Sequence, residues 1–252
     1  MPPPPPQRAG VTPPPAARSG RVAPGAGGGV AGAGLRNAGA IIPSVRAETT
    51  LRQVGRRVAI GEIGAPSLLA LLAFALRLYR VEAPSLWFDD THSVHMAGLG
   101  LAQLIAEVSA DIHPPLYFVA LGWWMRFAGG SEFALRYFTL AAGTLAVPLL
   151  FVLGRRVGGR RLGLAAAATV ALSPLLVYYA QEVRMYAPSV TLVTAVAFFA
   201  WRGMAGERPR RWVAQYVLLA AAAGYTHLFN LAVVAMLNVA YAALAVWPAV
   251  SA

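Results

Sequence analysis

The chain has no cysteine and no lysine, and it is poor in acidic residues. Without cysteine it can form neither a disulfide framework nor a thiolate metal site. Its 21 basic residues, all arginine, face ten acidic residues and give a net charge of +11. In a soluble protein that charge would indicate a nucleic-acid partner. Here the arginines lie mainly in an N-terminal tail and in short loops, which fits membrane orientation and predicts no nucleic-acid binding.

Charge of either sign is scarce, and apolar residues dominate. Hydrophobic residues make up 58% of the chain and charged residues 12%, a composition outside the range of ordinary soluble domains. Several apolar runs approach the roughly 20 residues that cross a hydrocarbon core about 30 Å thick. The pattern predicts an all-α protein, a polytopic transmembrane helical bundle over residues 56–252 in contact with membrane lipids. A soluble all-α protein with many buried helices is the alternative. The apolar runs lie near 58–79, 137–153, 162–179, 187–201, 212–225 and 228–247.

Residues 1–50 form a segment of low complexity, rich in proline, glycine and alanine. Such a segment buries too little apolar surface to offset its ordering entropy, so we expect a disordered N-terminal tail. It does not read as a signal peptide, because the first apolar run begins only near residue 58. That run is therefore predicted to remain as an uncleaved first span.

The arginines predict an orientation, because cytoplasmic loops of membrane proteins carry an excess of basic residues. Arginines at 46–57 precede the first span and place the N-terminus in the cytoplasm. Residues 81–112 contain no arginine and are acidic, as an extracytoplasmic loop would be. Arginine clusters at 155–161 and 202–211 are predicted to lie inside.

With residues 81–112 outside and the arginines at 155–161 inside, the chain must cross the membrane an odd number of times between residues 112 and 154. Two apolar segments lie there, 114–128 and 137–153. The first would span roughly 22 Å as a helix, which is short for a full crossing. We interpret it as a re-entrant or juxtamembrane helix. The alternative is that both segments cross and that the arginines at 155–161 lie outside, against lipid phosphates.

The acidic residues concentrate in the predicted exterior loop. Five of the ten lie between Glu82 and Asp111, and ionised groups at a membrane boundary are costly unless they are solvated, paired or used. An amphipathic helix along the membrane surface is predicted for 94–110, with Ser93 as its N-cap. The segment His113-Pro114-Pro115 predicts a rigid corner, because each proline restricts the residue before it.

The adjacent carboxylates of Asp89 and Asp90, after Trp87 and Phe88, would suit sugar transfer from a lipid-linked phosphate. That reaction needs a base for the acceptor's proton and positive charge for the departing phosphate. A glycosidase would instead need two separated carboxyls. Adjacent side chains on a helix diverge by about 100°. We interpret the pair as one base and one orienting or metal-linked neighbour, both candidates for catalysis. A solvated loop with two aspartates is the alternative.

His113 is a candidate for two roles. It could hydrogen-bond a donor phosphate, or it could ligate a hard divalent cation beside Asp89. A divalent cation is therefore a candidate cofactor, with Asp89 and His113 as its ligands. A structural histidine at the membrane interface is the alternative.

Further candidates for substrate binding follow in the turn 178–186 and near the C-terminus. Arg184 could grip a phosphate while Glu182 orients it. A local ion pair within an aromatic interface belt, to which Tyr186 would belong, is the alternative. His227 is flanked by aromatic residues and is the last candidate. Its alternative is a helix-end histidine that is merely hydrogen-bonded.

Three stretches in this order and spacing resemble a known superfamily. The chain is similar to the GT-C membrane glycosyltransferases, closest to the RgtA/B/C/D-like branch, which is related to protein mannosyltransferases and aminoarabinose transferases. The similarity covers roughly residues 60–247. The stretches are Trp87-Phe88-Asp89-Asp90, then His113-Pro114-Pro115-Leu116-Tyr117-Phe118 leading to Ser131-Glu132-Phe133-Ala134-Leu135-Arg136, and then Ser173-Pro174 with Gln181-Glu182-Val183-Arg184-Met185-Tyr186.

The resemblance implies a multi-spanning helical fold and a polyprenyl-phosphate sugar donor. It also implies an extracytoplasmic site, a glycan, lipid or protein acceptor, and inversion at the anomeric carbon. By motif position Asp89 would be the base or metal-linked acid, and Asp90 stands where the commoner pattern has glutamate. His113 would lie near the donor, and Arg184 falls in the second exterior motif. Members usually continue for several hundred residues, so the chain resembles their N-terminal half.

A second class of function is a non-catalytic polytopic membrane protein, a transporter or an assembly partner, whose polar groups serve passage or packing. A transporter would be expected to repeat its hydropathy pattern along the chain, and no such repeat is evident here. An inactive fragment of a glycosyltransferase is the remaining alternative.

Overall fold

The structure, a computed structural model, describes residues 64–205 and 210–250, which all belong to one compact unit, Arg52–Ala252. The predicted tail, 1–50, lies outside the described residues. Throughout the described part the regular secondary structure is helical, which confirms the all-α prediction there. The helices are Gly64–Leu78, α2 (Phe88–Gly98), α3 (Leu101–Ser109), α4 (Leu116–Ala128), α5 (Glu132–Leu172), α6 (Pro174–Gln181), α7 (Tyr186–Met204), α8 (Arg210–Thr226) and α9 (Phe229–Val250).

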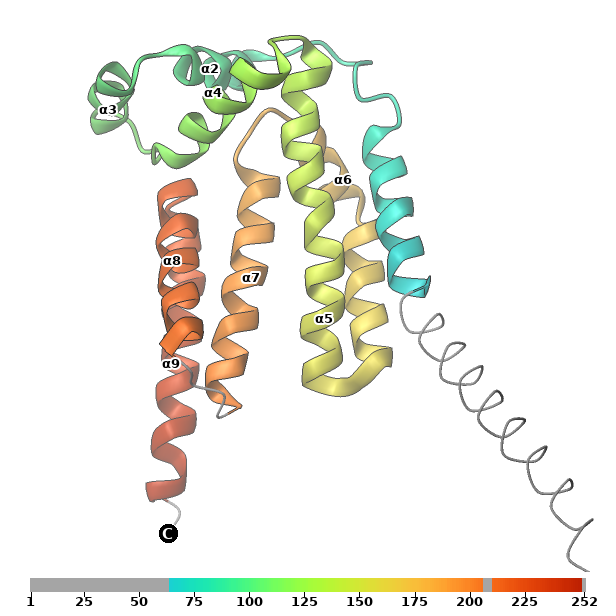
Figure 1. Cartoon of the computed structure of the whole chain (residues 1–252), viewed down its shortest axis with the longest axis vertical. Coiled ribbons are helices and arrows are strands. Elements are labelled where there is room, and N and C mark those ends of the chain that lie inside the picture. The colour runs from blue at the N-terminus through green and yellow to red at the C-terminus, as the bar shows by residue number, and fades with distance from the viewer. Residues whose placement is uncertain (1–63, 206–209, 251–252) are drawn as a thin grey trace, which may run out of the picture. The chain divides into compact units, whose positions relative to one another are not determined.

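Helix α5 is a hairpin of two antiparallel arms, 132–157 and 160–172 (Figure 1). The chain reverses at Gly158 and Gly159, whose backbone angles are not helical. Gly159 has φ +83°, a left-handed conformation that glycine adopts without steric cost. The arginine cluster at 155–161 therefore lies at a tight turn between the two arms, as the interruption between apolar runs predicted.

The two arms of α5 approach closely at Gly154 and Gly163. A Cβ atom on Gly163 would lie 2.6 Å from the carbonyl oxygen of Phe151, and one on Gly154 would lie 2.9 Å from the Gly163 Cα. Small residues at a helix crossing let the two backbones come into contact. Glycine at both positions is thus required by the packing of the hairpin.

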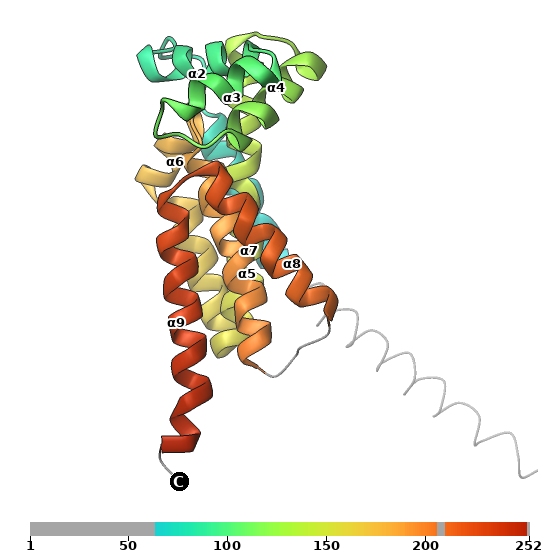
Figure 2. The same cartoon turned by 90° about the vertical axis from the view of Figure 1, so that its left-hand side faces the viewer.

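Helices α2, α3 and α4 gather at the end of the molecule away from the α5 turn, and we call these three helices the cap (Figures 1 and 2). Their core contains Phe118, Leu121 and Met96, packed with Val183 and Met185 from the segment between α6 and α7. The cap is therefore joined to the bundle through that segment.

Two predicted helices are wrong in their extents. The amphipathic helix predicted for 94–110 with Ser93 as its N-cap is two helices, because α2 begins at Phe88 and the chain is extended at Leu99 and Gly100. Ser93 lies inside α2. The apolar run 162–179 is likewise divided at Ser173, whose hydroxyl accepts a hydrogen bond from the Leu176 N–H at the start of α6. Proline at the next position suits the first turn of a new helix.

The segment 182–185 between α6 and α7 turns the chain by 118°. Its four residues are all buried. Just before it, the side-chain amide of Gln181 donates to the backbone carbonyls of Arg77 and Tyr79, both at 2.9 Å. This anchoring holds the segment, which we call the α6–α7 break, at the cap end of the bundle.

Arg77 is a buried cation that joins the first described helix to the end of α5. Its guanidinium donates to the carbonyl oxygens of Ala73, Val170 and Ala171 at 3.1, 3.0 and 3.4 Å. The carbonyls at a helix C-terminus carry partial negative charge. They accommodate this cation without a carboxylate, since no ion pair to Arg77 occurs within the described residues.

One described helix, α5, is long and apolar enough to cross a membrane, and α6 with α7 would form a second span if the bent pair counts as one. The helices Gly64–Leu78 and Phe229–Ala243 are apolar but shorter. Length and composition of the described helices thus establish one or two candidate spans, fewer than the six apolar runs predict.

Candidate functional site

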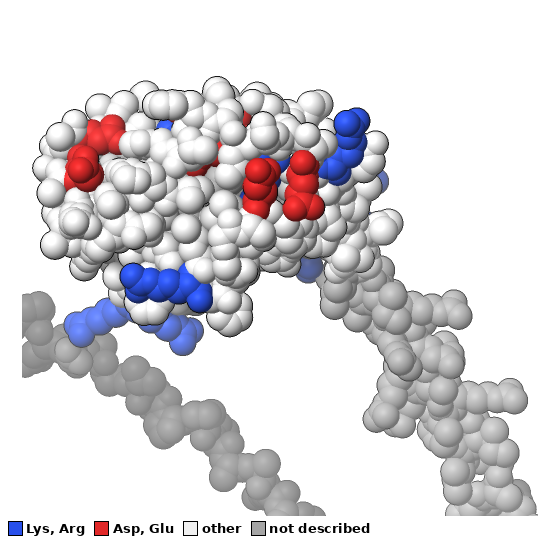
Figure 3. Space-filling model, turned by 90° about the horizontal axis from the view of Figure 1, so that it is seen from above, with Lys and Arg blue, Asp and Glu red and all other residues white. Residues whose placement is uncertain are grey.

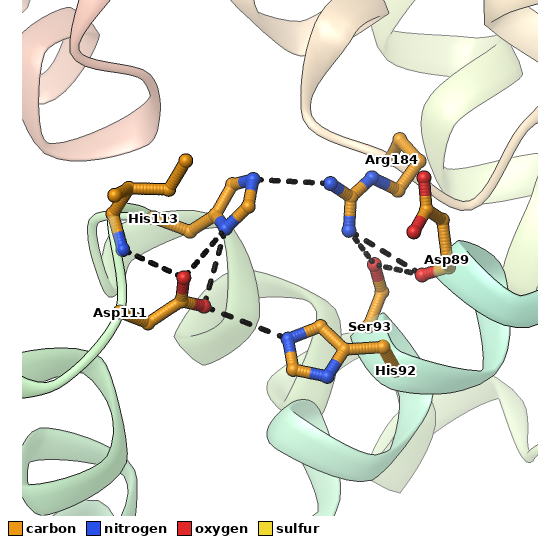
Figure 4. A network of polar contacts seen from close by, with 7 residues as sticks. Asp89, His92, Ser93, Asp111, His113 and Arg184 are labelled. Atoms are coloured by element: carbon orange, nitrogen blue, oxygen red, sulfur yellow. Dashed lines mark hydrogen bonds and ion pairs between the residues drawn. The ribbon is translucent and has the colours of Figure 1, made fainter.

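A polar network forms where three segments of the chain meet at the cap end (Figure 4). The N-terminal half of α2 contributes Asp89, His92 and Ser93. The corner between α3 and α4 contributes Asp111 and His113, and the α6–α7 break contributes Arg184. Residues more than 70 positions apart in the sequence therefore share one site.

Arg184 is the centre of the network and is only 4% exposed. Its Nη2 donates to His113 Nε2 at 3.1 Å. Its Nη1 donates to the backbone carbonyl of Asp89 at 3.4 Å and to the hydroxyl of Ser93 at 3.3 Å. No described carboxylate forms an ion pair with this guanidinium. Arg184 is thus a buried, oriented cation without a counterion.

His113 is held from both sides of its ring. Its Nδ1 lies 3.1 Å from each carboxylate oxygen of Asp111, and its Nε2 faces Arg184. Asp111 also accepts from the Ile112 N–H at 2.6 Å and lies 3.6 Å from His92 Nε2. Burial alone would raise the pKa of Asp111, but the His113 hydrogen bond, the Ile112 N–H and the nearby histidines outweigh it and lower that pKa.

Asp89 and Asp90 lie in different surroundings, as their adjacency on a helix predicted. Asp90 is 2% exposed, and its Oδ1 accepts from the Val183 N–H at 2.8 Å. Burial raises the pKa of Asp90, although the N–H groups of Val183 and Trp87 and the charges of two arginines oppose the shift. The Asp89 carboxylate is half-buried and receives no hydrogen bond from the described residues. Asp90 therefore fixes α2, and Asp89 keeps its acceptor oxygens available.

Among the described residues Glu182 forms no ion pair with Arg184, so neither the predicted orienting contact nor the alternative local ion pair is seen there. The Glu182 carboxylate is buried, with one oxygen unpartnered. Burial raises its pKa, and a hydrogen bond with Tyr178 opposes the shift. Glu182 still interacts electrostatically with Arg184, Asp89 and Asp90, so it lies near the network without a direct contact to Arg184 among the described residues.

Tyr186 and His227 border the network. The Tyr186 ring centroid lies 5.9 Å from the Arg184 guanidinium carbon and 6.0 Å from the His227 ring. His227 Nδ1 accepts from the Phe229 N–H at 3.2 Å. Burial lowers the pKa of His227, and the electrostatic influence of the nearby His113 and Arg184 lowers it further. The predicted site residues therefore lie in one region, and Glu182 is linked to the others there by charge and not by a direct contact.

A cavity of about 440 Å³ opens beside His113, between the α3–α4 corner and helices α8 and α9. Asp111 and His113 line it together with Tyr225 and Leu228. Its walls are otherwise largely apolar. One side of the network is thus accessible to a ligand.

A divalent cation between Asp89 and His113 does not fit this geometry. Both ring nitrogens of His113 are engaged, one by Asp111 and the other by a guanidinium. Among residues 64–205 and 210–250, no three histidine, aspartate or glutamate side chains come together as metal ligands would.

Sequence reasoning missed Asp111, and it assigned Ser93 to a helix cap. The spacing Asp111-Ile112-His113 carried a usable signal, because a carboxylate near a histidine in sequence can orient its ring. Ser93 carried none, since its contact with Arg184 joins residues 91 positions apart.

Substitutions at Asp90 separate its hydrogen bond from its charge. Asp90→Asn keeps a carbonyl oxygen for the Val183 N–H, whereas Asp90→Leu leaves that buried N–H unpaired, at a cost of about 1–3 kcal/mol. Because its pKa is raised in the folded state, Asp90 contributes stability below the usual aspartate pKa of about 3.9, and this is lost as pH rises through the raised value.

We therefore expect the free energy of unfolding of the wild type, relative to Asp90→Asn, to fall as pH rises from about 3.9. At each pH, Asp90→Leu should be the least stable of the three proteins. Denaturant unfolding in detergent measures both quantities. A wild type that gains stability over Asp90→Asn across that range would contradict the assignment.

The sequence matches one known protein family. Residues 112–250 match the family model described as dolichyl-phosphate-mannose-protein mannosyltransferase. The matched stretch includes His113, Arg184 and His227, and Asp89 and Asp90 precede it. No curated protein and no solved structure matches the chain significantly. Because the match covers more than half of the sequence, the chain belongs to the dolichyl-phosphate-mannose-protein mannosyltransferase family, membrane glycosyltransferases of the GT-C type.

Proposed function

We propose that the protein transfers a sugar from a polyprenyl-phosphate donor to an extracytoplasmic acceptor in a single inverting displacement. One observation carries this proposal. Arg184 is a buried cation that forms no ion pair with any described carboxylate, and it donates to the backbone carbonyl of Asp89, whose own carboxylate accepts no hydrogen bond from the described residues. A site for an anionic leaving group and a candidate base are thus adjacent.

Arg184 would bind the donor phosphate. Burying a charge without a counterion carries a desolvation cost, and an incoming anion offsets part of that cost. Negative charge grows on the phosphate as its bond to the sugar breaks, so a fixed guanidinium stabilises the transition state more than the ground state. The contacts to His113, Ser93 and the Asp89 carbonyl hold the guanidinium in place before the donor arrives.

Asp89 would act as the general base. It takes the proton of the acceptor hydroxyl while the acceptor oxygen attacks the anomeric carbon. The new carbon–oxygen bond forms on the face opposite the phosphate, and the polyprenyl phosphate leaves with the electron pair of the old bond. A single displacement of this kind inverts the anomeric configuration. Asp90 would take no part in proton transfer, because its carboxylate is buried and accepts a hydrogen bond from the Val183 N–H.

The cavity beside His113 is where we place the transferred sugar. Its volume of about 440 Å³ lies within the range typical of small-molecule sites, about 300–1,000 Å³. Two polar groups among apolar walls, Asp111 and His113, would orient a sugar there.

We also propose a multi-pass orientation in the cell membrane with the cap outside. All acidic residues of the described part lie between Glu82 and Glu182, and exposed ones appear on the face seen from the cap side (Figure 3). Arginines from the α5 turn and from the end of α7 meet at the other end, where Arg156 and Arg202 both pack on the Phe198 ring. The position of α4 within the cap supports our interpretation of 114–128 as a re-entrant or juxtamembrane helix, over the alternative that it crosses the membrane.

The substitution Asp89→Asn should abolish sugar transfer while leaving donor binding nearly intact. Loss of a general base lowers turnover by about 10²–10⁴-fold, and the Arg184 contact to the Asp89 backbone carbonyl is retained. The assay uses membranes with a labelled polyprenyl-phosphate sugar. Glu82→Gln, an exposed acid of the same region, is the matched control and should transfer at the wild-type rate. Equal transfer by Asp89→Asn and the wild type would refute the assigned base.

Cysteine labelling should place the two ends of the molecule on opposite sides of the membrane. Phe88 is 81% exposed in the cap and Val157 is 48% exposed at the α5 turn, and the native chain has no cysteine to label. An impermeant maleimide should label Phe88→Cys in intact cells, and Val157→Cys only after permeabilisation. Labelling of both in intact cells would support the alternative in which the α5 turn lies outside.

A further inference from the structure

We propose that Asp111 is a positioning residue that controls the tautomer of His113 and, through it, the orientation of Arg184. The carboxylate keeps the ring proton of His113 on Nδ1, which leaves the Nε2 lone pair to accept a hydrogen bond from the guanidinium. The ligand that Arg184 would bind depends on the proposed function, whereas the tautomer of His113 does not.

Two independent contacts demand the same tautomer. On one side, an ionised carboxylate can only accept, so the Nδ1 that lies 3.1 Å from both Asp111 oxygens must carry a proton. On the other side, a guanidinium can only donate, so the Nε2 that lies 3.1 Å from Arg184 Nη2 must present its lone pair. The lowered pKa of Asp111 keeps the carboxylate ionised and supports the first contact.

The His113 contact is the one that can direct Arg184. Its length is 3.1 Å, whereas the contacts to Ser93 and to the Asp89 carbonyl are 3.3 and 3.4 Å. If the proton moved to Nε2, two N–H donors would face each other and this contact would be lost. The guanidinium would then keep only two weak acceptors, both on α2, and would turn toward them.

Asp111 is itself fixed, as a positioning residue must be. The Ile112 N–H holds one of its oxygens at 2.6 Å, and His92 Nε2 lies 3.6 Å from the other. His92 belongs to α2 and His113 to the α3–α4 corner. One carboxylate therefore ties the corner to α2, and its effect reaches the α6–α7 break through His113.

The test is ¹⁵N NMR of the full chain in detergent with ¹⁵N-labelled histidine. The chain has four histidines, and the His113→Gln variant identifies the His113 signals by their loss. The ring-nitrogen shifts distinguish a protonated nitrogen from one with a lone pair. In the wild type, His113 should carry its proton on Nδ1 alone. A proton on Nε2 would overturn the proposal without any variant.

Two substitutions then separate the acceptor from the charge. Asp111→Asn keeps an oxygen for the Nδ1–H and should preserve the tautomer, whereas Asp111→Leu should yield a mixture or the Nε2–H form. Unchanged signals from the exposed His95 show that the fold is retained. An unchanged His113 tautomer in Asp111→Leu would overturn the proposal.

Kinetics provide the second readout. Loss of a residue that orients a ligand-binding group typically costs about 10–100-fold in affinity or activity. Asp111→Leu should raise the donor KM by about tenfold with a smaller effect on kcat, and Asp111→Asn should stay near the wild type. Equal damage from both substitutions would overturn the acceptor role. If the wild type transfers no sugar, the proposed function fails, and the tautomer is still decided by NMR.

Discussion

The site depends on one hydrogen bond, from the Val183 N–H to the Asp90 carboxylate, at 2.8 Å. It joins α2 to the α6–α7 break, two segments that approach each other from 93 positions apart. Asp89 is the neighbour of Asp90 on α2, and Arg184 is the neighbour of Val183 in the break. The hydrogen bond between Val183 and Asp90 therefore also fixes the positions of Arg184 and Asp89, the two residues that perform the proposed chemistry. Burial of the bond in the cap core excludes the water that would otherwise compete for both groups.

Three buried arginines occur in the described part of the chain, and two of them, Arg136 and Arg184, act electrostatically on Asp90. Arg77, Arg136 and Arg184 are each nearly inaccessible, and each has a buried Nε without a hydrogen-bond partner. The nearby acids Asp90 and Glu182 are buried as well, and burial raises the pKa of both carboxyls. Carbonyl oxygens at helix ends offset part of the cost for Arg77. The balance around Arg184 favours an incoming anion, which is the electrostatic basis for a phosphate donor.

The helical class and most residues of the candidate site could be predicted from the sequence, whereas the contacts between those residues could not. Apolar runs separated by arginines indicated helices and the position of the α5 turn. Asp89, His113 and Arg184 stood out because charged residues are rare in such a chain. The division of α2 from α3 was missed because extended backbone at Leu99 and Gly100 interrupts a continuous apolar pattern. The contact of Ser93 with Arg184 and the separation of Glu182 from it arise from tertiary packing, which local periodicity does not encode.

The central claim is that Arg184 meets the donor phosphate beside the Asp89 carboxylate. The most direct measurement is an experimental structure of the protein with a non-transferable phosphonate analogue of a polyprenyl-linked sugar. The account predicts phosphonate oxygens within hydrogen-bonding distance of the Arg184 guanidinium, and the anomeric carbon facing Asp89 with the sugar in the cavity beside His113. A phosphonate bound at the arginine-rich end near Arg156 and Arg202, with Arg184 free of it, would contradict the account.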